Sequence, residues 1–426
     1  MSGLLLTFYG DDFTGSTDAL EALAAGGVPA VLFLEPPDQA ALAGFPDCRA
    51  VGVAGVSRSQ TPEWMSEHLP AVFGRLKALD APICHYKVCS TFDSSPARGS
   101  IGRALEIGQD VFGNACVPVV VGVPALGRYV LFGHLFARAG GEVYRIDRHP
   151  TMSCHPVTPM TESDLRLHLA RQTGRKIGSL DIVSIRQGNA RTKWDELVRE
   201  GCRVAIFDGL DEDTLAETGR LLCDLSRSTQ LFAVGSSGLE YALVACWRAT
   251  RHLSPPVFTD PGPVERLIVV SGSCSPVTEG QIRWALANGF AGLRVHPDSD
   301  LENVRTRALE FLREGRSVVL YTALGPADRR FDMEGERMAT RLGELLRELM
   351  ESARVRRAVL AGGDTSGHAA RHLGLQALTL LRPLDPGAPL CRAHAPGSWL
   401  DGAELVFKGG QIGRPDFFEA VRRGRR

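Results

Sequence analysis

The chain has 426 residues, of which 44% are hydrophobic and 23% are charged, and its formal net charge is −1. This length predicts two or three domains, and the near-neutral charge argues against binding to nucleic acid or an anionic membrane through an overall field. No apolar run approaches the roughly 18 residues that a membrane-spanning helix needs. The ten cysteines include no CxxC pair, which is typical of a protein in a reducing cytoplasm.

The first predicted strand covers residues 4–8 and runs into a polar stretch at 10–18, followed by a helix at 19–25. A short apolar run, a glycine, polar residues and an Ala/Leu-rich segment are typical of strand, turn and helix. Asp11 and Asp12 follow the strand, at the end where open α/β sheets bind ligands. Both residues could simply form the turn, but the density of carboxylates and hydroxyls in this stretch favours a site.

Strands alternate with helices along the rest of the first half. Strands are predicted at 28–34, 50–56, 83–88, 116–123, 181–185, 203–207 and 231–234, and helices at 64–79 and 98–112. The stretch 124–155 is less regular, and a helix capped by Thr161 or Ser163 follows it, with Asp164 in its first turn. This alternation predicts a parallel, doubly wound sheet.

A proline-rich, aperiodic stretch at 254–264 is the best candidate for a linker. It divides the chain into domains at 1–253 and 265–426. Beyond it, strands are predicted at 266–270, 317–322, 355–360 and 405–407, and an amphipathic helix at 334–353. The sequence therefore predicts an α/β protein of two domains, each with a mainly parallel sheet flanked by helices, and a ligand cleft between them.

Three loops rich in glycine and serine follow predicted strands of the second domain, at 271–275, 362–367 and 408–413. Glycines let backbone N–H groups approach phosphate oxygens, and a helix N-terminus adds unpaired donors. Lys408 could offset phosphate charge. None of the loops has the Walker A spacing, and each alone is a weak signal. Three of them in one half of the chain favour an anion or nucleotide site.

The first domain carries charged and hydroxyl side chains on loops at predicted strand ends: Asp11, Asp12, Arg58, Lys87, Ser90, Thr91 and Asp93. Carboxylates accept hydrogen bonds from hydroxyls, and Arg and Lys pair with carboxylates or phosphates. A small polyhydroxy acid would need this combination. Surface solvation or a local ion pair is the alternative interpretation for Arg58 and Lys87.

Together these elements resemble the four-carbon acid sugar kinase family, through most of the chain. The resemblance is carried by residues 11–15, 57–59, 87–94, 133–136, 155–160, 271–275, 362–367 and 408–413. It implies an N-terminal domain that binds the sugar acid and a C-terminal domain that binds ATP. The chain departs from the family pattern at Gly409 and Ile412, where Ser and Phe are expected, at Asp364, where Glu is common, and at Ser100, where Asn is usual.

The resemblance also implies roles for individual residues. Sugar-acid contacts fall on Asp12, Arg58, Lys87, Ser90, Thr91 and Asp93. Nucleotide contacts fall on Ser271 or Ser273, Gly362, Gly363, Asp364, Thr365 and Gly410, and Lys408 lies in the same set of loops.

The function predicted from all of this is transfer of the γ-phosphoryl group of ATP to the terminal hydroxyl of a four-carbon acid such as threonate, erythronate or 3-oxotetronate. Asp12, or otherwise Asp11, would accept the hydroxyl proton, and Mg²⁺ on the phosphates is implied by the chemistry. A non-catalytic sugar-acid sensor and a nucleotide-linked dehydrogenase are the alternatives, although no G-x-G-x-x-G follows the first strand. We expect a cytoplasmic protein whose partners are a sugar acid and ATP, with homodimerisation left open.

Overall fold

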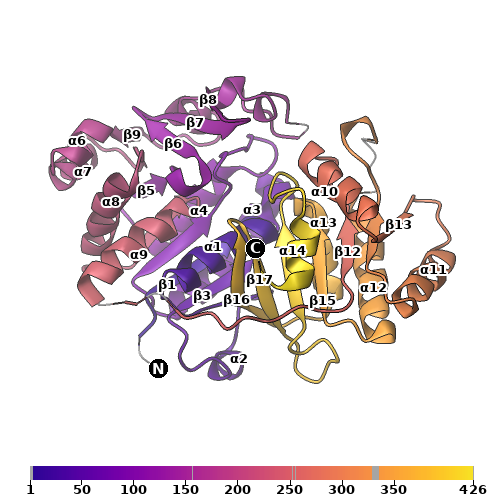
Figure 1. Ribbon diagram of the computed structural model, residues 1–426. Coiled ribbons are helices and arrows are strands. Elements are labelled where there is room, and N and C mark those ends of the chain that lie inside the picture. Colours follow the sequence, from indigo (N-terminus) through magenta and orange to yellow (C-terminus); the bar gives the residue numbers. More distant parts are fainter. Residues whose placement is uncertain (1–2, 156, 252, 255, 329–334, 426) are drawn as a thin grey trace. The chain divides into compact units, whose positions relative to one another are not determined.

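The structure is a computed structural model that describes residues 3–155, 157–251, 253–254, 256–328 and 335–425 (Figure 1). At residues 251, 335, 336, 364 and 365 only the backbone is described. Three predicted features extend outside the described residues: the linker at position 255, the motif 155–160 at position 156, and the helix 334–353 at its first position.

The chain forms two compact units. Unit 1 comprises residues 1–11, 22–30 and 36–256, and unit 2 comprises residues 12–21, 31–35 and 257–426. Most of the chain up to Pro256 belongs to unit 1, and the chain after it belongs to unit 2. Two short N-terminal segments, 12–21 and 31–35, also belong to unit 2. The sequence analysis placed a single boundary at 254–264. That residues 1–253 form the sugar-acid domain and residues 265–426 the nucleotide domain stays a prediction. The neighbouring residues Asp11 and Asp12 belong to different units.

Unit 1 is built on a parallel sheet whose strands pair in the order β3 (Ala50–Ala54), β1 (Leu6–Gly10), β4 (Ile83–Lys87), β11 (Leu231–Gly235), β5 (Val117–Val120), β10 (Val204–Phe207) and β9 (Ile177–Leu180). All five residues of β1 are buried, as expected for a strand covered on both faces. Gly10 pairs with Ala54 on one side and Lys87 on the other. The carboxyl ends of these strands therefore meet at one edge of the sheet.

Helices cover both faces of this sheet. On one face α3 (Pro62–Ala78), α4 (Ile101–Phe112) and α5 (Leu165–Ala170) bury an apolar core that includes Phe73 and Phe232. On the other face lie α7 (Ala190–Arg199), α8 (Glu212–Leu225) and α9 (Gly238–Arg251). Helix α3 begins at Pro62, before the predicted start at 64, because the Thr61 side chain accepts from the backbone N–H of Trp64 and proline stands in the first turn. Helix α2 (Gln39–Ala43) is short.

The irregular stretch after residue 124 contains a small antiparallel sheet, formed by β6 (Arg128–Leu131), β7 (His134–Ala139) and β8 (Glu142–Arg145). Phe132 and Gly133 make the first turn with φ of 51° and 79°. The buried carboxylate of Asp208 accepts from both of their N–H groups, at 2.6 and 2.9 Å. A carboxylate distant in sequence therefore stabilises this hairpin, which the local pattern did not predict.

Two sequence-based assignments are wrong. Residues 181–185 are not a strand, because Asp181 accepts from the N–H of Ser184 and starts helix α6 (Ile182–Arg186). The run of isoleucine and valine suggested a strand, yet the two isoleucines are buried one helical turn apart. Asp164 is the N-cap of α5, not a residue of its first turn, and accepts from the N–H of Arg166.

Unit 2 has a mixed sheet. The order is β13 (Ala291–Arg294), β14 (Val318–Tyr321), β12 (Ile268–Ser271), β15 (Arg357–Ala361) and β18 (Glu404–Lys408), all parallel, then β17 (Ala388–His394) and β16 (Ala377–Asp385), which are antiparallel. The N-terminal segment adds to its edge, because Leu32 and Phe33 of β2 (Ala30–Phe33) pair with β16. The fold class predicted from the sequence is confirmed: an α/β chain with two units and mainly parallel sheets.

Helices also cover both faces in unit 2. Helices α10 (Pro276–Ala287) and α14 (Phe417–Arg423) enclose one apolar core. Helices α1 (Phe13–Ala25), α11 (Leu301–Arg313), α12 (Gly335–Ala353) and α13 (Gly363–His372) cover the other face. The ring of Phe13 lies 4.5 Å from that of Phe407, and this contact places the N-terminal half of α1 in unit 2.

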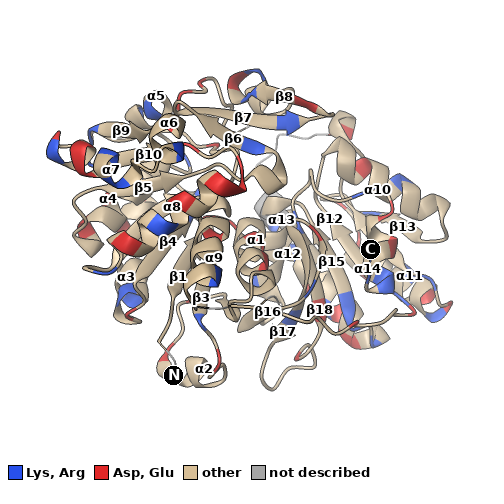
Figure 2. Cartoon of the chain, turned by 60° about the vertical axis from the view of Figure 1, so that its left-hand side comes forward, with Lys and Arg blue, Asp and Glu red and all other residues tan. Residues whose placement is uncertain are grey.

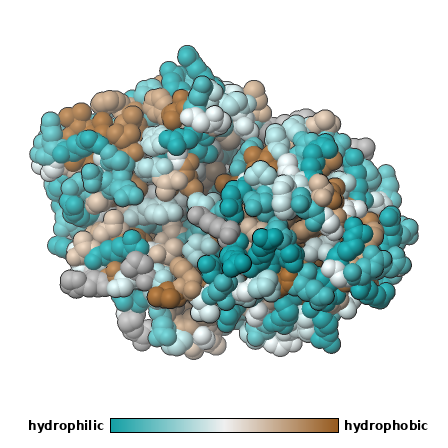
Figure 3. Space-filling model, viewed as in Figure 1, coloured by the Kyte–Doolittle hydropathy of each residue, from teal (hydrophilic) through white to brown (hydrophobic). Residues whose placement is uncertain are grey.

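The outer helices carry charges of both signs. Figure 2 shows Lys and Arg interspersed with Asp and Glu, and helices such as α7 and α11 pair them along one face, for example Arg191 with Asp195 and Arg305 with Glu302. Hydrophilic residues cover most of the face of unit 2 that Figure 3 shows. Among the described residues, no helix has the length and apolar character needed to span a bilayer.

Candidate functional site

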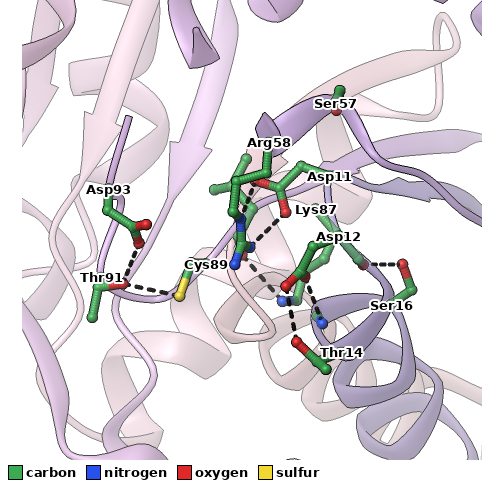
Figure 4. A network of polar contacts seen from close by, with 12 residues as sticks. Asp11, Asp12, Thr14, Ser16, Ser57, Arg58, Lys87, Cys89, Thr91 and Asp93 are labelled. Carbon is green, nitrogen blue, oxygen red and sulfur yellow. Dashed lines mark hydrogen bonds and ion pairs between the residues drawn. The ribbon is translucent and has the colours of Figure 1, made fainter. Parts of the chain in front are cut away.

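In unit 1 the strand ends place Arg58 against Asp11. The guanidinium donates from Nε and Nη2 to the two carboxylate oxygens, at 3.1 and 2.6 Å, and Figure 4 shows this fork. The backbone supports the pair, because the N–H of Arg58 donates to the carbonyl of Asp11 at 3.0 Å. A bidentate pair fixes the orientation of both groups as well as their separation. Asp11 is buried, whereas Arg58 keeps part of its surface exposed.

The loop after β4 turns Thr91 and Asp93 toward each other. Phe92, between them, is buried and has a φ of 56°, a left-handed conformation that is rare for a large side chain. The Thr91 hydroxyl donates to Asp93 Oδ1 at 2.5 Å and approaches the sulfur of Cys89 at 2.9 Å. Burial would raise the pKa of Asp93, but the charge of Arg58 and the bond from Thr91 outweigh it and lower that pKa. Asp93 is therefore a carboxylate at neutral pH.

Lys87 lies at the end of β4, next to this cluster. Its carbonyl accepts the N–H of Asp11 at 2.8 Å. The residue is buried, and its side-chain nitrogen donates to the carbonyl of Val88 at 3.1 Å. Ser90 is half-buried in the same loop. The predicted sugar-acid residues of unit 1 thus gather at the carboxyl ends of β1, β3 and β4.

Asp12 begins α1 in unit 2. Its carboxylate accepts from the Thr14 hydroxyl at 2.8 Å and from the N–H of Gly15 at 2.7 Å, the contacts of a helix N-cap (Figure 4). A Cβ atom added to Gly363 would lie 3.6 Å from Asp12 Oδ2 and 4.0 Å from Thr14 Oγ1. The Asp12 carboxylate therefore lies beside the first turn of α13, where one of the predicted nucleotide loops begins.

Gly362 connects two of these loops. It precedes α13 with a φ of 116°, a conformation that side chains rarely adopt, and its N–H donates to the carbonyl of Lys408 at 2.9 Å. Gly363, Asp364 and Thr365 follow as the first turn of α13. The side chains of Asp364 and Thr365, both predicted to bind nucleotide, lie outside the described part of the chain.

The serine loop and the C-terminal glycine loop are packed together. Ser271 Oγ accepts from the N–H of Ser273, and Ser273 Oγ accepts from the N–H of Ser275, at 3.4 and 3.2 Å. A Cβ atom on Gly410 would lie 2.5 Å from Ser273 Oγ. Position 410 therefore has no room for a side chain unless Ser273 moves, and the close approach explains this glycine better than backbone freedom does.

Lys408 lies beneath the C-terminal loop. Its ammonium is fully buried and donates to the Thr278 hydroxyl at 3.0 Å, and Thr278 in turn donates to the carbonyl of Gly410 at 2.8 Å. Burial lowers the pKa of Lys408 to about 7. Through Thr278, the Lys408 side chain thus stabilises the loop that carries Gly410. An offset of phosphate charge by Lys408 stays a prediction.

Three threonines in these contacts were not among the predicted site residues. Thr14 binds Asp12, Thr278 binds Lys408, and Thr158 donates to the second oxygen of Asp93 at 3.3 Å. Thr14 and Thr158 lie within stretches that the sequence analysis had marked. Thr278 has no local signal, since only the fold brings α10 to the end of β18.

Metal binding was tested against the side chains present. Among the described residues, no group of three or more His, Cys, Asp or Glu side chains is arranged to hold a metal ion. Mg²⁺ that arrives with ATP keeps several waters and needs only one or two protein carboxylates. Asp12, beside the first turn of α13, fits that requirement, so the residues present are compatible with Mg²⁺ carried by the nucleotide.

Comparison with known proteins identifies the class of protein. Residues 6–243 match the model of a sugar-binding N-terminal domain, and residues 268–418 match that of a nucleotide-binding C-terminal domain. A 3-oxo-isoapionate kinase from Paraburkholderia graminis is 48% identical, with 100% of this chain and 95% of that protein covered. A 3-oxo-tetronate kinase from Pseudomonas savastanoi pv. phaseolicola is 33% identical, covering 97% and 96%.

Solved structures agree on the fold. A protein from Salmonella typhimurium LT2 superposes with a TM-score of 0.81 at 24% identity, and 99% of each chain is covered. A Haemophilus influenzae protein superposes with a TM-score of 0.73 at 22% identity, covering 98% and 99%. These two likenesses concern the fold alone. The two domain matches and the kinase relatives define the class of protein, a phosphotransferase. The chain belongs to the four-carbon acid sugar kinase family, which confirms the resemblance found in the sequence.

Proposed function

We propose that this enzyme transfers the γ-phosphoryl group of ATP to a hydroxyl of a 3-oxo sugar acid, with 3-oxo-isoapionate as the first candidate and 3-oxotetronate as the second. The order rests on sequence identity, which is 48% to a 3-oxo-isoapionate kinase and 33% and 32% to two 3-oxo-tetronate kinases. Threonate and erythronate, expected from the sequence alone, become comparison substrates. The terminal hydroxyl remains our proposed acceptor.

The Arg58 cluster in the sugar-binding half is the observation that carries this proposal. The carboxylates of Asp11 and Asp93 are buried acceptors suited to hydroxyl groups, and Arg58 and Lys87 beside them are the cations that could pair with the carboxylate of an acid substrate. Ser90 and Thr91 add hydroxyls that can donate or accept.

Asp12 is the proposed general base. Phosphoryl transfer asks a protein mainly for positioning and charge stabilisation, with one group that accepts the hydroxyl proton. Asp11 is held in a bidentate pair by Arg58, which suits it to positioning. Asp12 is oriented by Thr14 and Gly15 beside the first turn of α13, where the phosphate would bind. Geometry therefore favours Asp12 over its neighbour.

The nucleotide is assigned to the three loops of unit 2. The N–H groups in the first turn of α13 are the proposed phosphate donors, with Gly362, Gly363 and Gly410 keeping the backbone accessible. Mg²⁺ bound to the phosphates would neutralise charge that develops during transfer. Asp12 is the described residue that could also meet this ion, and Lys408 holds the loop that carries Gly410.

The test is an ADP-release assay with purified protein and a panel of acids. We expect 3-oxo-isoapionate to give the highest kcat/KM, followed by 3-oxotetronate, then threonate and erythronate. Product analysis by NMR would show which oxygen carries phosphate. If none of the acids stimulates ADP release while ADP itself binds, the chain acts on another acceptor and this assignment is wrong.

A further inference from the structure

Helices α8 and α9 of unit 1 approach each other unusually closely, and Figure 1 shows them side by side. A Cβ atom added to Gly219 of α8 would lie 1.9 Å from the carbonyl oxygen of Ala242 in α9. Both helices follow parallel strands of one sheet, β10 and β11, and lie on the same face, so they run in the same direction. One helical turn beyond this contact, the residue four positions after Gly219 in α8 therefore faces the residue four positions after Ala242 in α9.

Those residues are Cys223 and Cys246. Residues four apart share one face of a helix, so both sulfurs point into the α8–α9 contact. The Cys223 side chain forms a hydrogen bond with that of Cys246, which shows that the sulfurs meet. Cys246 is buried, whereas Cys223 is half-buried, so small solutes can reach the pair from its side.

The electrostatic surroundings favour a thiolate here. The hydrogen bond from Cys223 is the largest cause that lowers the pKa of Cys246, to about 7, and the charges of Arg220 and Arg227 contribute. The fully buried pair Cys116 and Cys202 behaves in the opposite way, since burial raises the pKa of Cys116 to about 12. Reactivity with oxidants follows the thiolate, so only the first pair combines proximity with an ionisable sulfur.

We propose that Cys223 and Cys246 form an oxidation site that closes to a disulfide when the protein meets a hydroperoxide such as hydrogen peroxide. The Cys246 thiolate attacks one peroxide oxygen, the O–O bond breaks, and the departing hydroxide takes up a proton to become water, which leaves a sulfenic acid. The Cys223 sulfur then displaces the sulfenic hydroxyl, which leaves with the Cys223 proton as a second water. Peroxide is reduced, two thiols are oxidised, and the new bond joins α8 to α9.

The sequence allows a direct test, because trypsin cuts between the two cysteines at Arg227. Native full-length protein is treated with hydrogen peroxide, its remaining thiols are alkylated, and it is digested without reductant. We expect peptides 221–227 and 228–248 to be found linked by mass spectrometry and to separate with dithiothreitol. Cys116 and Cys202, in the same sample, should be found alkylated and unlinked.

Variants complete the design. Cys223→Ser and Cys246→Ser should each abolish the linked peptides, while Cys116→Ser should leave their yield unchanged. A bridge restricts the unfolded chain, so the oxidised protein should melt a few degrees higher, reversibly with dithiothreitol, and Cys223→Ser should show no such rise. The proposal is wrong if both cysteines are recovered alkylated after a treatment that oxidises the exposed Cys154. It is equally wrong if the bridge forms only in samples that have lost their cooperative melting transition.

Discussion

The guanidinium of Arg58 binds both carboxylate oxygens of Asp11, a residue 47 positions earlier in the chain. The next residue, Asp12, belongs to unit 2 and lies beside Gly363 at the start of α13. One dipeptide therefore serves two different sets of contacts. This separation gives each carboxylate a distinct expected phenotype.

Arg58→Lys should weaken sugar-acid binding and leave the nucleotide alone. Lysine keeps the charge but loses the planar fork that binds Asp11. Hydrogen bonds to charged groups contribute roughly 1.5–3 kcal/mol, so we expect KM for the acid to rise about 10- to 100-fold. Steady-state kinetics measures KM for the acid, and ADP calorimetry measures the affinity for the nucleotide. Arg145→Lys, which alters a similar fork to Asp147 in the small sheet, is the matched control, and an unchanged KM in Arg58→Lys would remove Arg58 from the substrate site.

Asp12→Asn should lower kcat by about 10²-fold or more, the scale of general base catalysis. Asparagine is as good an N-cap as aspartate, so α1 should keep its start and ADP should bind with nearly the same affinity. Asp38→Asn changes the N-cap of α2 in the same way and should leave kcat unaltered. Near-normal turnover in Asp12→Asn would transfer the role of base to Asp11.

Gly410→Ala should impair nucleotide binding, because its Cβ would lie 2.5 Å from Ser273 Oγ. The two loops would have to separate, and ADP affinity should fall by an order of magnitude or more. Gly280→Ala, in the neighbouring helix α10, adds a methyl group to open space and is the control. Adding Ser273→Ala to Gly410→Ala should restore part of the affinity, and calorimetry that finds no loss in the single variant would show that the loops are not the nucleotide site.

Lys408 should make stability depend on pH. Its pKa falls from 10.5 in the unfolded chain to about 7 when folded. Between these values the unfolded state binds more protons, so stability should rise with pH, with a slope approaching about 1.4 kcal/mol per pH unit from this residue. Urea unfolding across that window should show the slope in the wild type and lose it in Lys408→Met.

Two further results bear on Lys408. Lys77→Met is the control, because Lys77 is partly buried and donates to the carbonyl of Val111. It shows how far the pH slope changes when a lysine is replaced by methionine elsewhere in the protein. If phosphate approaches Lys408, ADP binding above pH 7 should take up a proton, which calorimetry in buffers of different ionisation enthalpy detects. Equal pH slopes in wild type and Lys408→Met would contradict the lowered pKa.

Much of the fold could be predicted because its signals are local. Apolar runs identified most strands of both sheets but not β9, β13, β16 or β17, and the helices predicted at 64–79 and 98–112 correspond to α3 and α4. The assignment of residues 181–185 failed for a local reason too: a β-branched run outweighed an equally local N-cap at Asp181. The antiparallel turn at Phe132 depends on Asp208, 76 residues away, and lay beyond any local pattern.

The sequence by itself determined which residues stand at strand ends, and therefore the candidate site, because periodicity and turn chemistry are properties of neighbouring residues. Only the tertiary structure decided what those residues contact. It assigned Asp11 and Asp12 to different units, brought Thr278 to Lys408 across 130 residues and buried that ammonium. Pairing and burial depend on which distant elements cover a side chain, and that is decided when the whole chain packs.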